Sequence, residues 1–143
     1  MKNYKNFINE SSEFYSNKSV KIGEVYSSDV IHSEVQNLHR NEEDFDEGDI
    51  SDRIYEFSEY EVAELPIEKI SMNDYEIDDD KVEEYVEMYK KTKTYPPIVL
   101  GYYDERWGYD IIDGTHRANA LKNCGLKTII SFVGLNEKQK KVE

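Results

Sequence analysis

One turn, Asp113-Gly114-Thr115-His116-Arg117, constrains the fold of this chain more than any other segment. The residues just before it, 109–112, form an apolar run typical of a strand, and the stretch 118–124 is typical of a short helix that ends at Gly125. A glycine between a strand and a helix lets the backbone turn tightly and come close to a ligand. The sequence therefore predicts a helix N-terminus directly after a strand.

The same turn contains the components of an anion site. The start of a helix offers unpaired N–H groups and the positive end of a dipole. Thr115 adds a hydroxyl group, and His116 and Arg117 add nitrogen donors. These groups favour a phosphate ligand. The alternative is purely structural: Asp113 and Thr115 cap the helix, and Arg117 lies in solvent.

Further segments with recognisable patterns surround the turn. An apolar stripe at Val82, Tyr85, Val86 and Tyr89 predicts a helix over about 79–91, which the three aspartates 78–80 would cap rather than use to bind Mg²⁺. A strand is expected to start at Ile98 after two prolines, and 109–112 would return as its hairpin partner. Residues 128–133 run apolar, as a largely buried strand does.

Together these segments resemble the ParB/sulfiredoxin-like family over residues 64–134. The matching segments follow the family's order: 65–70 for its first strand, 78–86 for its first helix, 95–100 for its Pro-Pro-Ile strand, 111–117 for its phosphate-binding turn and 126–130 for its closing strand. The resemblance implies a small α/β (α+β) domain, a mixed sheet with helices, that binds a nucleoside triphosphate.

The resemblance also assigns roles to residues. It implies ATP or CTP as ligand, with Mg²⁺ held chiefly by phosphate and water, and no metal site built from protein side chains. Lys81 matches a lysine that contacts nucleotide in sulfiredoxins. The expected binding residues are Lys81, Gly114, Thr115, His116 and Arg117, and the expected catalytic residues are Asp113 and His116. Glu76 and Asp78 are alternative general bases, and the sequence does not decide among the candidates.

Activities in this family diverge, so the fold alone does not identify one. Relatives reduce cysteine sulfinic acid, phosphorylate free serine, partition DNA under CTP control or are described as nucleases. Thr115 occupies the position of the sulfiredoxin catalytic cysteine, and the only cysteine is Cys124. A hydroxyl cannot replace a thiolate in that chemistry, so sulfiredoxin activity is excluded.

The predicted function is therefore nucleoside-triphosphate binding, as in a small phosphotransferase or NTPase. One alternative is a non-catalytic acidic regulator or inhibitor that binds a protein, including by mimicry of DNA. A second alternative is a nuclease. The formal net charge of −13 opposes direct binding to nucleic acid and to anionic membranes. We expect a cytoplasmic protein whose acidic N-terminal extension could engage a protein partner.

We expect the chain to divide into three parts: an acidic extension over 1–63, partly helical or flexible, a domain over 64–134 that the resemblance implies to be nucleotide-binding, and a charged tail over 135–143. Within the extension we expect weakly held residues 1–20, an amphipathic helix around 28–40, an acidic loop over 41–49 and a short strand over 54–58. His32 and His39, on the predicted helix, are expected to be ordinary surface or half-buried histidines.

Overall fold

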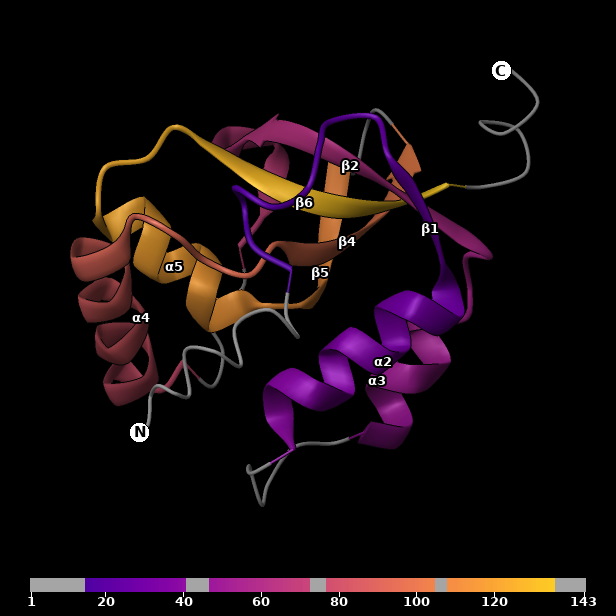
Figure 1. The fold of residues 1–143 in the computed structure, drawn as a ribbon, viewed down its shortest axis with the longest axis horizontal. Coiled ribbons are helices and arrows are strands. Elements are labelled where there is room, and N and C mark those ends of the chain that lie inside the picture. Colours follow the sequence, from indigo (N-terminus) through magenta and orange to yellow (C-terminus); the bar gives the residue numbers. More distant parts are fainter. Residues whose placement is uncertain (1–14, 41–46, 73–76, 105–107, 136–143) are drawn as a thin grey trace.

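The computed structural model describes residues 15–40, 47–72, 77–104 and 108–135. Within these ranges it contains a six-stranded mixed sheet and four α-helices (Figure 1), which confirms the predicted mixed α/β class. The elements in chain order are β1 (Val25–Ser27), α2 (Ser28–His39), α3 (Glu47–Ile54), β2 (Glu59–Pro66), the 3₁₀ helix η2 (Ile67–Lys69), β3 (Ile70–Ser71), α4 (Asp79–Thr92), β4 (Ile98–Asp104), β5 (Gly108–Asp113), α5 (Thr115–Asn123) and β6 (Thr128–Leu135).

The strand order in the sheet is β1-β2-β6-β4-β5-β3. Strands β4 and β5 form the antiparallel hairpin expected from the sequence, while β6 pairs parallel to β4 and antiparallel to β2. Strand β2 runs across the boundary expected between residues 63 and 64, and β1 from the N-terminal part extends the same sheet. The turn over 113–117, predicted to bind phosphate, follows β5, next to the central strands.

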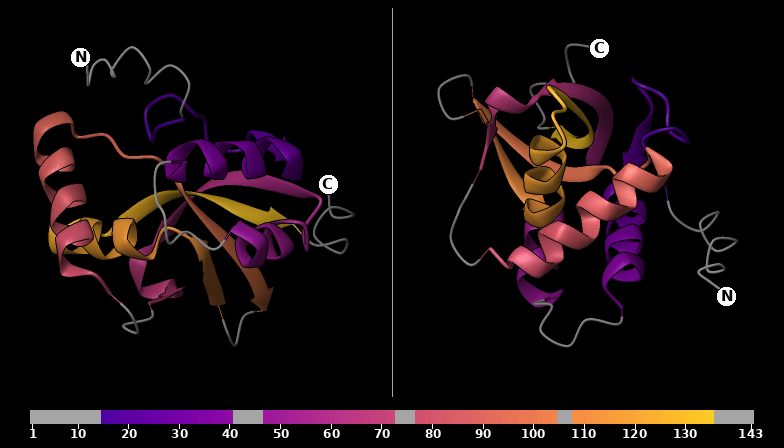
Figure 2. Two further views of the ribbon diagram at one scale, coloured as in Figure 1. Left: turned by 90° about the horizontal axis from the view of Figure 1, so that it is seen from below. Right: turned by 90° about the vertical axis from the view of Figure 1, so that its left-hand side faces the viewer.

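Apolar clusters lie on both faces of the sheet. Neighbouring residues of a strand point to opposite faces. On β6, Phe132 belongs to a cluster with Ile31 and Val35 of α2, whereas Val133 belongs to a cluster with Leu121 of α5. Helices α2 and α5 therefore cover opposite faces of the sheet. Figure 2 shows α4 beside α5, and Val82 and Val86 of α4 pack there against Ala120.

The N-terminal part of the described chain is tied to the rest of the fold at several points. Asn17 donates its backbone N–H to the Tyr95 carbonyl at 2.9 Å, and its side-chain oxygen accepts the Tyr95 N–H at 3.0 Å. Val20 is buried in the cluster that contains Phe132. Residues 15–20 are thus well held, contrary to the prediction for 1–20, while residues 1–14 lie outside the described part.

Most predicted helices and strands are present, with two errors. The segment 65–70, expected as the first strand, contains the 3₁₀ helix η2 between the end of β2 and the short strand β3. Helices α2 and α4 match the predictions for 28–40 and 79–91, and the Asp78 carboxylate accepts the Asp80 N–H at 2.9 Å, which confirms the cap. The strand predicted over 54–58 is wrong, because Ile54 ends helix α3. Residues 47–49 of the expected acidic loop belong to α3 as well, and 41–46 lie outside the described residues.

Phe57 explains why this segment is not a strand. Its ring lies on two glycines that face each other in the sheet, Gly101 of β4 and Gly134 of β6. A Cβ atom added at Gly134 would lie 2.4 Å from Phe57 Cγ, so the glycines make the space for the ring. The residues after Ile54 therefore cross the sheet face instead of pairing along it.

In the described part of the chain, no helix is long and apolar enough to cross a membrane.

Candidate phosphate-binding turn

Gly114 shapes the turn between β5 and α5. It is the N-cap of α5 and has φ 116° and ψ 23°, a backbone conformation that suits glycine. A Cβ atom at this position would lie 2.6 Å from Ile98 Cγ2, so the turn also has no space for a larger residue. Gly114 cannot cap the helix with a side chain, and its carbonyl accepts the Ala118 N–H at 2.8 Å. The N–H groups of the first turn of α5 therefore have no intrahelical acceptors.

The N-terminus of α4 meets the N-terminus of α5 at this place. The Asp78 backbone N–H donates to His116 Nε2 at 3.0 Å, so the His116 ring, from the first turn of α5, bridges the two helix ends. The nitrogen that accepts this bond carries no proton, which assigns the ring N–H to Nδ1. Helix α4 is capped by its own Asp78 carboxylate. The start of α5, which lacks a side-chain cap, is the end open to an anion.

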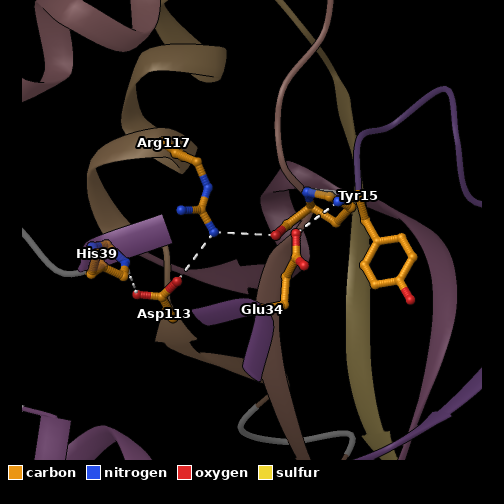
Figure 3. Close-up of polar contacts among 6 residues, drawn as sticks. Tyr15, Glu34, His39, Asp113 and Arg117 are labelled. Carbon is orange, nitrogen blue, oxygen red and sulfur yellow. Dashed lines mark hydrogen bonds and ion pairs between the residues drawn. The ribbon is translucent and has the colours of Figure 1, made fainter. Parts of the chain in front are cut away.

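A buried ion pair lies beneath the turn. Arg117 is 1% exposed and Asp113 is 6% exposed. Arg117 Nη2 donates to Asp113 Oδ2 at 3.3 Å and to the Pro97 carbonyl at 3.1 Å. Figure 3 shows the guanidinium bonded to Asp113, while the nearby Glu34 carboxylate is bonded to Tyr15. Its outer face lies against Tyr85 of α4, with Cζ 5.9 Å from the ring centroid.

Burial and charge act in opposite directions on this pair. Burial acts to raise the pKa of Asp113, but the charge of Arg117 and the hydrogen bond from His39 outweigh it, and the pKa is lowered. Burial likewise acts to lower the pKa of Arg117, and the attraction of Asp113 outweighs it, so that pKa is raised. Both side chains are therefore charged at neutral pH.

Helix α2 supplies two further polar groups that sequence reasoning missed. His39 Nε2 lies 2.9 Å from Asp113 Oδ1, and the buried Glu34 carboxylate accepts the Tyr15 backbone N–H at 2.7 Å. Burial raises the pKa of Glu34 to about 7, against the lowering effects of the Tyr15 N–H and the Arg117 charge. These residues lie more than 70 positions before the turn, so no local motif joins them to it.

The structure brings most of the predicted site residues together and buries two of them, Asp113 and Arg117. Gly114, Thr115 and His116 form the turn, and Lys81 lies in the first turn of α4, the helix whose N-terminus meets it. Arg117 is directed into the core, where it holds Asp113 and Pro97, and not toward solvent as a phosphate ligand.

Asp113 differs from expectation for a related reason. Both of its oxygens are engaged, and its lowered pKa makes it a weak base. In this structure Asp113 anchors His39 and Arg117. Asp78, an alternative base, caps α4 with its carboxylate, while Glu76 lies outside the described residues. In the described ranges, no three carboxylate, histidine or cysteine side chains are grouped so that they could hold a metal ion.

Comparison with known proteins identifies the family. The ParB N-terminal domain model matches residues 51–143, well over half of the chain. The protein therefore belongs to the ParB N-terminal domain family, and the resemblance to the ParB/sulfiredoxin-like fold is confirmed. No curated protein matches the chain significantly.

Solved structures with a similar fold include three kinds of protein. Sulfiredoxin from Arabidopsis thaliana is 27% identical, with a TM-score of 0.46, and the match covers 57% of this chain and 92% of that one. A free serine kinase mutant in complex with ADP is 20% identical, with a TM-score of 0.47, over 50% of this chain and 30% of the kinase. The C-terminally truncated chromosome-partitioning protein ParB from Caulobacter crescentus, complexed with CTP-γ-S, is 23% identical, with a TM-score of 0.44, over 55% and 47%.

Proposed function

We propose that this protein binds a nucleoside triphosphate, ATP or CTP, with the phosphates at the start of α5. The observation that carries the proposal is the Gly114 turn, which leaves the first N–H groups of α5 without a side-chain cap. A helix N-terminus of this kind favours an anion through its N–H groups and its dipole. The nucleotide as ligand class follows the resemblance set out from the sequence.

Neighbouring side chains complete the proposed phosphate site. The Thr115 hydroxyl adds a donor at the first residue of α5. Lys81 of α4 adds a positive charge that neutralises phosphate. His116 has its ring between the two helix ends and, with the proton on Nδ1, holds α4 against α5 through Asp78. Asp113 and Arg117 support the turn from the core side.

A bound Mg²⁺ would be held chiefly by phosphate and water oxygens and would balance part of the phosphate charge. The chain's own contribution would be to position the phosphates and to neutralise them in part. Phosphoryl transfer depends largely on such positioning and charge stabilisation. A phosphotransferase or NTPase would also need a residue that orients the attacking hydroxyl or water, and His116 remains the candidate nearest to the proposed site.

The test is calorimetric titration of the full chain with ATP, CTP, GTP and ADP, each with and without Mg²⁺. We expect binding of ATP or CTP, and a loss of roughly tenfold or more in affinity for Lys81→Ala, since a hydrogen bond to a charged group contributes about 1.5–3 kcal/mol. Lys91→Ala is the matched control, because Lys91 is exposed in the last turn of the same helix. If no nucleotide binds the wild type at millimolar concentration, the proposal is wrong.

Catalysis is tested separately from binding. The nucleotide that binds is incubated with the protein and Mg²⁺, and release of inorganic phosphate is measured with and without free serine as acceptor. Release in water alone indicates an NTPase, and a phosphorylated acceptor indicates a phosphotransferase. Tight binding without turnover would instead favour a nucleotide-regulated binding protein.

A further inference from the structure

Helix α2 contacts the turn after β5 on its core side, and this helix lies outside the residues that the family model matches. The match begins at residue 51, whereas α2 ends at His39. His39 is the last residue of the helix, and its ring lies against Asp113, with Nε2 2.9 Å from Oδ1. The His39 side chain is 12% exposed, so this contact is largely shielded from water.

The two oxygens of Asp113 are divided between two partners. Oδ1 faces His39 of α2, and Oδ2 accepts from Arg117 of α5. Asp113 directly precedes Gly114, so the angle of this carboxylate is coupled to the direction in which the backbone enters the turn. A buried carboxylate with one oxygen unpaired would rotate or draw in water to satisfy it.

Arg117 depends on the same carboxylate. Its guanidinium is almost fully buried, and in the described part of the chain its Nε has no hydrogen-bond partner. Asp113 and the Pro97 carbonyl are its hydrogen-bonded anchors through Nη2. We therefore expect a shift of Asp113 to disturb Arg117, although Pro97 and Tyr85 also hold it, and with it the first turn of α5, whose N–H groups form the proposed phosphate site.

We propose that His39 is a positioning residue for the phosphate turn and that it acts through Asp113. Helix α2 thereby completes a site that the family-matched region does not complete alone. His39 touches neither the phosphates nor the nucleotide. It fixes Asp113, Asp113 fixes Arg117 and the entry to Gly114, and the N–H groups of α5 are held in place for the anion. The proposal rests on the proposed function where it concerns affinity, but its structural part stands without a ligand.

The test compares two replacements of similar size in the full chain. His39→Gln keeps an amide donor that can reach Asp113, whereas His39→Met fills the space without a donor. His32→Ala is the control on the same helix, since the His32 ring packs against Tyr55, with ring centroids 5.3 Å apart. Two quantities are measured for each variant: the affinity for ATP and for CTP with Mg²⁺, and the amide chemical shifts of Gly114 and Thr115 in the ligand-free protein.

We expect His39→Met to lower nucleotide affinity roughly tenfold, as for loss of one charge-assisted hydrogen bond, and to shift both amide signals. His39→Gln should restore affinity and signals to near wild type, and His32→Ala should change neither. If His39 had only a structural role, the donor in His39→Gln would not restore the affinity or the amide signals. Wild-type signals in His39→Met, or equal losses in the Met and Gln variants, would overturn the proposal. If the wild type binds no nucleotide, the proposed function fails, and the amide shifts still decide whether His39 positions the turn.

Discussion

Gly114→Ala tests the geometry of the turn most directly. The substitution has two costs. An alanine at φ 116° is strained, and placing a non-glycine residue in the left-handed region costs about 1–2 kcal/mol. The new methyl group would also lie 2.6 Å from Ile98 Cγ2 and 3.0 Å from Arg117 Nη2, and overpacking of a core typically costs about 1–3 kcal/mol. We expect a total loss of about 2–5 kcal/mol in the free energy of unfolding.

Gly125→Ala separates the two costs. Gly125 also has a positive φ, 92°, but a Cβ atom there would have no neighbour within 4 Å. This variant should lose only the conformational part, about 1–2 kcal/mol. Both free energies are measured by urea unfolding followed by circular dichroism, and the difference between the variants gives the steric part. Equal losses in the two variants would refute the argument that Ile98 and Arg117 leave no space for a side chain at position 114.

Three other substitutions test the core and the buried charges. Val86→Asp should abolish cooperative unfolding in a thermal melt, because it places an unpaired carboxylate between α4 and α5; a wild-type melting curve would contradict the register of α4. Arg117→Ala should lower the free energy of unfolding by about 3–5 kcal/mol, because it leaves Asp113 charged and buried without this partner; urea unfolding measures the loss, and a variant as stable as the wild type would contradict it. Glu34 has a folded-state pKa of about 7, above its ordinary value of 4.5. Between these two values the folded protein holds a proton on Glu34 that the unfolded chain releases. The Glu34 contribution to the free energy of unfolding should therefore decrease as pH rises from about 4.5 to 7. Glu34→Gln removes this contribution, so urea unfolding at pH 5 and pH 8 should show the variant gaining stability relative to wild type at the higher pH; an unchanged difference would show that Glu34 titrates normally.

The sequence predicted those parts of the fold that depend on local signals. The spacing of Val82 and Val86 and the aspartates before them were enough for α4, since periodicity and capping act within a few residues. The Gly114 turn could be found for the same reason. Phe57 shows the limit: its segment looks strand-like, but its place is decided by two glycines, Gly101 and Gly134, far along the chain.

In the candidate site, too, local sequence signals predicted some residues and missed others. Gly114, Thr115 and His116 were identified because turn and helix start are adjacent in the sequence. The burial of Arg117 was missed, because it follows from Asp113 and the Pro97 carbonyl closing around the guanidinium in three dimensions. His39 carried no signal at all, since a histidine at the end of an amphipathic helix can face water equally well, and only the docking of α2 decides its partner.

The docking of α2 also bears on how the molecule would come apart. Ile31 and Val35 of α2 share one apolar cluster with Val99, Ile112 and Phe132. These three residues belong to β4, β5 and β6, which lie wholly within the family-matched region. The family match begins at residue 51, but because of this shared cluster we expect the unit that unfolds cooperatively to include α2. Amide protons of β6 should exchange with solvent only when α2 has also separated, so the helix, although it lies outside the shared family sequence, sets the lifetime of the sheet that the family shares.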